Sequence, residues 1–498
     1  MLAQKLILSY SSKIIVQFIQ IIATIIVARI AGPTVIGTIA YCLSFVSMFI
    51  FVADLGSGTA HIKLISEGQK TEDCITTYST IKVILTILFL FIVICAYFVQ
   101  KYFLNGFESK THEIVLFIFL TIIVIERLLD IIKTTFAANT QQAKQDIPDF
   151  IYILLYQLFR IGIVLAGYKA IALALGNFFA LLIVIPLYIY LFKEYSFGIL
   201  KKALIKKYLA IGIPVLLIGV ATNMSNYLDK VILQYFCDST EVGYYTAGFK
   251  IGGFILLIAN SVSMLFFPLF SKAISEGNID FIKDKINKFE RFSLIFIMPV
   301  VIIVVLFSDV IVLTLLGKEY INSISILSII TVAMFFYTLF VPYGNIILGM
   351  GYFKAAAIVN IINFTCFIIL QILLVHPKLF GFGAMGAAIA VLFSRVLISF
   401  MFILVSKYKC NISMNVKNLK YLLFGLSIYF ISKYLLKNII SESYFYYFLF
   451  VLSFLILNYL LLYLFKMFNK TDIQYISQLL NIKELKKYIK SEILKKDL

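Results

Sequence analysis

Charged residues are scarce in this chain: Asp, Glu, Lys and Arg make up 14% of its 498 residues, while hydrophobic residues make up 62%. Soluble proteins carry about 25% charged and about 45–50% apolar residues. A water-soluble core could not hide this much apolar surface, so the composition excludes a soluble protein of several domains. It predicts an all-α, polytopic membrane protein instead.

Cysteine and histidine are also few. The six cysteines are scattered without a close pair, and the three histidines, His61, His112 and His376, fall in connections between apolar runs. No two histidines have metal-like spacing, so we expect no disulfide framework, no metal site and solvent-facing histidines. The sequence also lacks a G-x-x-x-x-G-K-[ST] motif and any constellation of a nucleophile with an acid/base pair. We therefore expect no cofactor and no enzyme activity.

What the chain does contain is a succession of fourteen apolar runs. Their length and uniform apolarity are typical of helices that satisfy their own backbone hydrogen bonds in lipid. The runs cover residues 14–30, 36–53, 79–100, 113–132, 150–168, 170–192, 208–229, 244–270, 292–316, 320–348, 353–375, 384–405, 419–438 and 444–468. They predict about fourteen transmembrane helices.

Basic residues outnumber acidic residues by 43 to 25, which gives a net charge of +18. With the N-terminus placed in the cytoplasm and residues near the ends of spans counted with the adjoining connection, the inside connections carry 29 Lys and Arg, the outside connections carry 9, and five lie deeper within spans. Cytoplasmic connections of membrane proteins carry such an excess. We therefore expect a multi-pass protein of the cell membrane with both termini cytoplasmic, and no nucleic-acid partner.

Three cytoplasmic pieces have an amphipathic pattern: residues 198–208, 271–291 and 473–498. We expect them to lie on the anionic lipids of the inner leaflet, with a specific protein partner as the alternative.

An internal similarity divides the chain. Residues 31–40 resemble residues 237–246 at an offset of 206, with an apolar residue and glycine at 36–37 and 242–243. The pairs Lys144/Lys354 and 170–174/383–390 follow in the same order. Two parallel six-helix lobes around a central cavity would explain this, although chance similarity among apolar helices stays open. The expected parts are a first lobe at 1–192, a basic cytoplasmic linker at 193–207, a second lobe at 208–405, helices 13 and 14 at 406–470, and a basic amphipathic cytoplasmic tail at 471–498.

Several motifs resemble those of Wzx-type polysaccharide flippases. They are Ala28 to Gly37 (ARIAGPTVIG), Asp54 to Gly56 (DLG), Tyr227 to Leu233, Glu241 to Tyr245, Leu316 to Tyr320 and Leu348 to Gly351. Ala31 departs from the family, which usually has Leu there. The resemblance covers residues 1–405.

The resemblance implies a fold like that of multidrug and toxin extrusion (MATE) proteins, within the multidrug/oligosaccharidyl-lipid/polysaccharide exporter superfamily. It also implies translocation of a polyprenyl-pyrophosphate oligosaccharide from the inner to the outer leaflet for O-antigen or other surface polysaccharide, by alternating access and coupled to an ion. Polysaccharide assembly proteins would be further partners. A MATE-like exporter of small molecules and a membrane polysaccharide polymerase or ligase remain alternative functions.

Charges within spans mark the candidate site, because an ion at bilayer depth costs at least ~2.5–3.5 kcal/mol. A pyrophosphate would need cations, so the candidates for binding substrate are Arg160, Arg395, Arg29, Lys250 and Arg127. For Arg29 and Lys250, snorkelling to the surface is the alternative, and for Arg127 a structural charge cluster with Glu126 and Asp130. We expect Arg160 and Arg395 to face one cavity from opposite lobes. The candidates for gating or ion coupling are Asp54, Asp229, Lys230, Glu126 and Asp130, with a surface ion pair as the alternative for Asp229 and Lys230.

The charge bias gives a test of topology. Tags at residues 1 and 498 should both report a cytoplasmic location, and a tag at residue 107 should report an outside location. Fusions to a phosphatase and to a fluorescent protein measure this. Opposite locations of the two termini would mean an odd number of crossings and would rule out fourteen spans.

Overall fold

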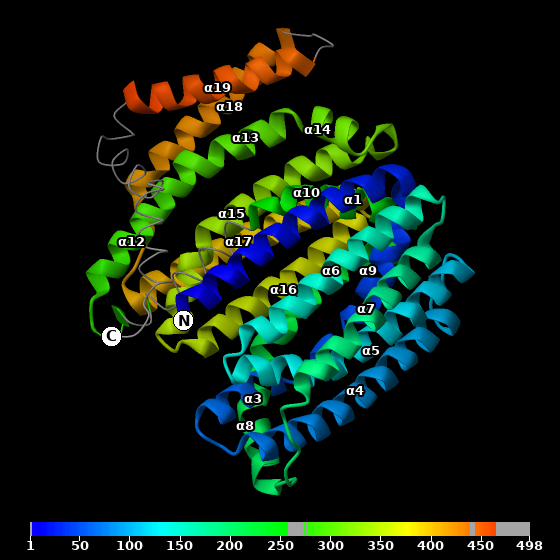
Figure 1. The fold of residues 1–498 in the computed structure, drawn as a ribbon. Coiled ribbons are helices and arrows are strands. Elements are labelled where there is room, and N and C mark those ends of the chain that lie inside the picture. Colours follow the sequence, from blue (N-terminus) through cyan, green and yellow to red (C-terminus); the bar gives the residue numbers. More distant parts are fainter. Residues whose placement is uncertain (1, 257–269, 271–272, 275, 439–443, 465–498) are drawn as a thin grey trace.

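The computed structural model describes residues 2–256, 270, 273–274, 276–438 and 444–464, and every regular element in this part of the chain is helical (Figure 1). This confirms the all-α fold. The predicted amphipathic tail at 473–498 lies outside the described residues.

The first half of the chain forms seven helices, two of which are short pieces between breaks. A break at Gly32, with φ 79° and ψ 168°, lies within the bounds of the first helix. Leu55 and Gly56, in the motif Asp54-Leu-Gly, adopt φ 43° and 65°, a left-handed backbone that ends one piece before the next begins. The helices are α1 (Leu2–Ser47), α2 (Ile50–Asp54), α3 (Ser57–Ser66), α4 (Thr71–Tyr102), α5 (Lys110–Ala138), α6 (Gln142–Leu165) and α7 (Ala170–Phe192).

The second half likewise contains long helices and short helical pieces separated by breaks. Its elements are α8 (Lys202–Ser225), α9 (Leu228–Phe236), α10 (Ser239–Gly252), η1 (Gly253–Ile255), α12 (Ile279–Phe292), the π-helical η2 (Ser293–Ile297), α13 (Met298–Leu306), α14 (Ser308–Leu315), η3 (Lys318–Tyr320), α15 (Ser323–Gly349), α16 (Phe353–Val375) and α17 (Gly383–Cys410). After it come η4 (Val416–Asn418), α18 (Leu419–Asn438) and α19 (Tyr444–Leu464). Helices α18 and α19 pack against α13 at one flank (Figure 1).

Eight helical stretches of the described residues are long and apolar enough to cross a membrane. They are Ile19–Ser47, Thr71–Tyr102, Gln142–Leu165, Ala170–Phe192, Ile279–Leu306, Ser323–Gly349, Phe353–Val375 and Gly383–Cys410. The protein is therefore a multi-pass membrane protein. The count of fourteen crossings and the location of the termini stay predictions.

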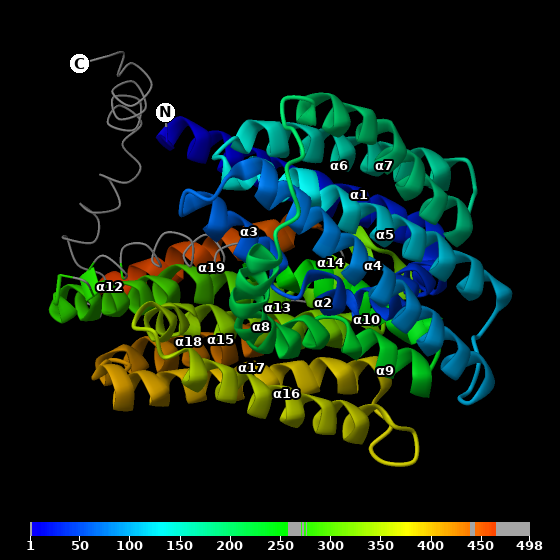
Figure 2. The same ribbon diagram turned by 90° about the horizontal axis from the view of Figure 1, so that it is seen from below.

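The helices of the two halves form two groups that meet along α1, α8 and α10. Figure 2 shows α1 and α4 to α7 on one side and α15 to α17 on the other. Helix α1 packs along α10, and α3 packs against α8. The halves are thus joined at two separate places.

The contact between α1 and α10 involves the two segments of the internal similarity. A Cβ atom added to Gly37 would lie 1.6 Å from the carbonyl oxygen of Ser239, and one added to Gly243 would lie 2.0 Å from that of Pro33. The hydroxyls of Thr34 and Thr240, also 206 residues apart, lie 3.0 Å from each other. Equivalent positions therefore meet each other, which supports two related halves around an axis that passes between these threonines.

Two of the predicted amphipathic pieces pack against protein. In the linker, the Gly198 N–H donates to the Glu72 carbonyl at 3.1 Å, and Lys201 forms an ion pair with Asp73 at 2.6 Å. In α12, Ile282 and Ile286 are buried against α15 and α17. Protein therefore covers part of each apolar face, whereas Ile199 and Leu200 of the linker are exposed, so contact of these pieces with lipid stays a prediction.

The threonine pair offers a test of the contact between the halves. The double variant Thr34→Cys/Thr240→Cys, without the native cysteines, should form a disulfide on mild oxidation, because the two Oγ atoms lie 3.0 Å apart. Mass spectrometry of the digested protein detects the link. Thr34→Cys/Thr246→Cys is the control, since Thr246 lies about 9 Å further along α10 at 1.5 Å per residue. Equal cross-linking of both pairs would contradict this contact.

Candidate functional site: a cationic cavity between the halves

A cavity of about 310 Å³ lies where α1 and α6 of the first half face α10 of the second half. Its lining includes two cations, Arg160 from α6 and Lys250 from α10. None of the described residues that line it is Asp or Glu. The cavity therefore combines a basic side chain from each half, and none of its described lining residues is an acid that could neutralise them.

The Arg160 side chain is held in place by uncharged neighbours. Its Nη1 donates a hydrogen bond to Oε1 of Gln157 at 2.9 Å, and the guanidinium lies 5.4 Å from the ring centroid of Tyr156. Arg160 is 8% exposed, and no described carboxylate lies within ion-pair distance of it. An arginine held this way keeps donors available for an anion.

Arg395 lines a different pocket. This second pocket, of about 400 Å³, lies within the second half among α8, α15, α16 and α17. The guanidinium lies 4.6 Å from the ring centroid of Tyr337. The expectation that Arg160 and Arg395 share one cavity is not met in this structure, because Thr246 and Lys250 of α10 line the first cavity and Phe249 lines the second.

Arg29 lies outside the cavity lining and joins the two halves. Its Nη1 donates to the carbonyl oxygen of Thr314 at 2.5 Å, at the last turn of α14, where a cation is favoured. Nearby, the Tyr320 hydroxyl donates to the Ala28 carbonyl at 3.1 Å. Arg29 therefore caps a helix of the other half.

Arg127 belongs to a charge cluster of which the sequence predicted only some members. It forms an ion pair with Asp130 at 3.0 Å. The missing member is Lys82, whose fully buried Nζ lies 3.1 Å from Asp130 and 3.7 Å from Asp54. The signal was a lysine within the apolar run 79–100, and only the fold shows which carboxylates surround it.

The other gating candidates also have partners. Asp229, 3% exposed, pairs with Lys230 at 3.0 Å and accepts a hydrogen bond from the Tyr245 hydroxyl at 2.6 Å, so the surface-pair alternative is wrong. The carboxylate of Glu126 faces the Tyr152 hydroxyl at 3.4 Å.

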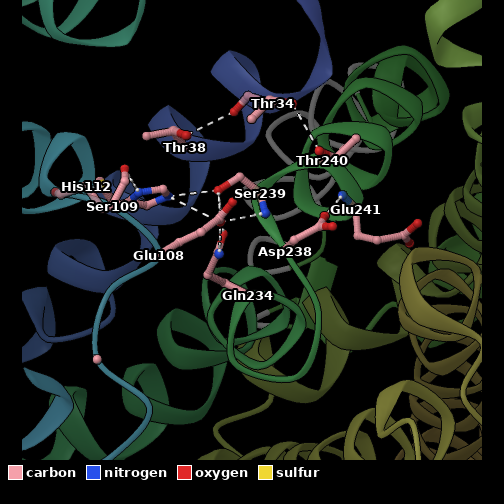
Figure 3. Close-up of polar contacts among 12 residues, drawn as sticks. Thr34, Thr38, Glu108, Ser109, His112, Gln234, Asp238, Ser239, Thr240 and Glu241 are labelled. Carbon is pink, nitrogen blue, oxygen red and sulfur yellow. Dashed lines mark hydrogen bonds and ion pairs between the residues drawn. The ribbon is translucent and has the colours of Figure 1, made fainter.

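Next to the contact of α1 with α10, a hydrogen-bonded cluster joins the loop before α5 to the start of α10 (Figure 3). Glu108 Oε2 accepts from the Ser239 hydroxyl at 2.5 Å, from the Ser239 N–H at 3.0 Å and from Gln234 Nε2 at 2.7 Å. His112 Nε2 lies 2.8 Å from the Ser239 hydroxyl. We call Glu108, His112, Gln234 and Ser239 the loop latch.

The second buried histidine lies at the other contact between the halves. His61 Nδ1 lies 2.7 Å from the Tyr208 hydroxyl of α8, and Nε2 lies 3.0 Å from the Thr135 hydroxyl of α5. Burial lowers the pKa of His61 to about 3, so it is neutral. The expectation of solvent-facing histidines is thus wrong for His61 and His112, which are 0% and 3% exposed. Tyr208, Thr135 and Ser239, whose hydroxyls contact these rings, are distant from them in sequence.

Comparison with solved structures shows that the chain shares its fold with membrane proteins of known structure. The structure is similar to "Lipid II flippase MurJ, inward closed conformation", with a TM-score of 0.73 and 17% identity over 91% of this chain and 97% of that one. It is also similar to an inward-facing multidrug resistance MATE family transporter, with a TM-score of 0.65 and 11% identity over 80% and 94% of the two chains.

The family follows from the sequence. The model of the family "Polysaccharide biosynthesis protein" matches residues 2–274, more than half of the chain, and the chain belongs to this family. The MatE model matches residues 214–374. A curated relative from Methanocaldococcus jannaschii, "Uncharacterized membrane protein MJ1068", is 26% identical over 196 residues, and the match spans only 38% of that relative's length.

The loop latch predicts a dependence on pH. Burial lowers the pKa of His112 below its usual value of 6.5, although the nearby Glu108 acts in the opposite direction. The closed contact therefore binds fewer protons than an open one, so its stability is present above pH 6.5 and decreases as the pH falls below that value. The groups that face His112 are Glu108 at 3.7 Å, the hydroxyls of Ser109 and Ser239, the Cys42 thiol at its carbonyl and the Tyr41 ring.

Distances between spin labels at residues 105 and 378 measure this opening. We expect a longer-distance population at pH 5 than at pH 8 in the wild type. His112→Gln keeps a donor for Ser239 but does not titrate, so its distances should be the same at both pH values. An equal pH response in this variant would assign the response to another group.

Proposed function

We propose that this protein is a flippase that moves a polyprenyl-pyrophosphate oligosaccharide from the inner to the outer leaflet, by alternating access coupled to an ion. Family membership and the two-lobe transporter fold support a transporter acting in polysaccharide biosynthesis. The observation that carries the substrate class is the cavity with Arg160 and Lys250 and no described carboxylate in its lining.

The charge of the cavity fits a pyrophosphate. The headgroup loses hydration when it leaves the leaflet surface, and two cations at bilayer depth replace part of that lost stabilisation. Arg160 contributes a guanidinium fork from the first half and Lys250 an ammonium from the second. An exporter of organic cations would instead need carboxylates facing its cavity.

The contacts between the halves define what must move. The loop latch with the glycine contact, and the His61–Tyr208 contact, lie at two separate places along the interface. Alternating access requires each contact to open in turn, so that the cavity faces one leaflet at a time.

Substitution of the cavity cations tests the proposal. Arg160→Gln and Lys250→Gln should each lower the affinity for polyprenyl pyrophosphate by about ten- to a hundredfold, since a charge-assisted hydrogen bond contributes about 1.5–3 kcal/mol. Arg160→Lys should retain part of it, because it keeps the charge without the fork. Native mass spectrometry measures binding, and proteoliposomes with the glycan-bearing lipid measure flipping.

Lys169→Gln is the matched control, because Lys169 is an exposed cation outside the cavity lining. If the arginine only stabilised the helix bundle, Arg160→Gln would lower the protein level but leave flipping per molecule normal. Normal flipping by the double variant Arg160→Gln/Lys250→Gln would rule out the cavity role.

A further inference from the structure

The second pocket differs from the cavity between the halves in its chemistry. Amides and hydroxyls from four helices meet in it: Thr222, Asn226, Asn345, Asn360, Asn363 and Ser394. Polar side chains in transmembrane helices are costly unless they have partners or bind a ligand. The aromatic residues Tyr337, Phe249 and Phe340 are also part of the lining. The volume of about 400 Å³ is within the range of roughly 300–1,000 Å³ for small-ligand pockets.

Some polar groups of this lining make no hydrogen bond to another described residue. Asn360 makes no side-chain hydrogen bond to a described residue. Asn363 uses its amide oxygen to accept from the Ser394 hydroxyl at 3.1 Å, which leaves its NH₂ group. These two asparagines lie three residues apart in α16, so they share one face of the helix.

One positive charge in the pocket has no acidic partner. No described carboxylate lies within ion-pair distance of Arg395, and Tyr337 lies against its guanidinium. Asp229 is the one acidic residue among the described lining residues, and it is occupied by Lys230 and Tyr245. The pocket therefore presents one free cation beside neutral donors and acceptors.

We propose that this pocket is a subsite for a uronic acid, a sugar ring that carries one carboxylate. The Arg395 fork would bind the carboxylate in a bidentate manner, and the asparagine amides would bond the ring hydroxyls. The aromatic side chains would cover the apolar face of the ring. This inference rests on the proposed function, because it assigns the acidic sugar of the glycan to this pocket and the pyrophosphate to the cavity of Arg160 and Lys250.

The two pockets lie on opposite sides of α10. The cavity between the halves has more basic side chains than the second pocket, just as a pyrophosphate has more negative charge than a carboxylate. The cavity with two cations suits a group of about two negative charges, whereas a single free guanidinium suits a single carboxylate. A neutral sugar would leave Arg395 without a counter-charge at bilayer depth.

Sodium glucuronate, glucose and inorganic phosphate are the probes for this subsite. Saturation-transfer NMR on the purified full-length protein in detergent should show binding of glucuronate with affinity at least about tenfold above that of glucose, and phosphate, added as a competitor, should displace glucuronate only at about tenfold higher concentration. Arg395→Gln and Asn360→Leu should each weaken glucuronate binding about tenfold or more, and Arg395→Lys should retain part of it. Arg160→Gln should leave glucuronate binding unchanged.

Thr365→Val is the matched control, because Thr365 is exposed on the same helix and its hydroxyl bonds only the Ile361 carbonyl. Equal binding of glucose and glucuronate, displacement of glucuronate by an equal concentration of phosphate, or full affinity in Arg395→Gln would overturn the inference. If Arg395→Gln does not fold, Asn360→Leu and Arg395→Lys decide the question.

Binding of sugar-free polyprenyl pyrophosphate, measured in parallel, separates the two proposals. Both proposals predict that this lipid binds the wild type and Arg395→Gln equally. If the lipid does not bind the wild type but glucuronate does, the proposed function fails and the sugar subsite stands. If Arg160→Gln weakens binding of the lipid but Arg395→Gln leaves the affinity for glucuronate unchanged, the proposed function stands and only the uronic acid subsite is contradicted.

Discussion

The backbone of α1 after Gly32 lies directly against the backbone of α10, and this close approach organises the interface between the two halves. Gly37 and Gly243 permit it, since the positions of their missing Cβ atoms are occupied by the other segment's carbonyls. The approach brings Thr34 to Thr240 and places Ser239 within reach of Glu108 and His112. The cavity that holds Arg160 and Lys250 adjoins this contact, because Ile36 also lines it. The glycines therefore matter through the distance they allow between helices.

Several charged side chains of the described helices are paired with a neighbour, which makes the unpaired arginines informative. Lys82 is fully buried between Asp54 and Asp130, and Asp229 is satisfied by Lys230 and Tyr245. Arg160 and Arg395 instead rest on aromatic rings and, for Arg160, on a glutamine. A buried charge without a counter-ion lowers stability. Both unpaired arginines line pockets, which is where a ligand could supply the missing charge.

The sequence predicted the helices and the two segments that meet between the halves, but it did not predict which side chains are buried at the contacts between distant segments. The apolar runs predict helices because lipid requires internal backbone bonding, and the glycine pair at an offset of 206 marked the segments that meet. His61 and His112 looked exposed because each lies outside an apolar run, yet Tyr208 and Ser239, at least 120 residues away in sequence, enclose them. The protein contacts that cover part of the apolar faces of residues 198–208 and 271–291 were not visible in the sequence, because the contacting residues are also distant in the chain.

The sequence alone determined the class of the molecule and most of its helical segments, because these follow from composition and run length. Which charges pair with each other depended on how helices rotate and pack, and this only the tertiary structure decided. The register of α6, α10 and α17 puts Arg160 and Lys250 in one cavity and Arg395 in another. A one-residue step on a helix turns a side chain by about 100°, so depth along a helix does not specify the direction that a side chain faces.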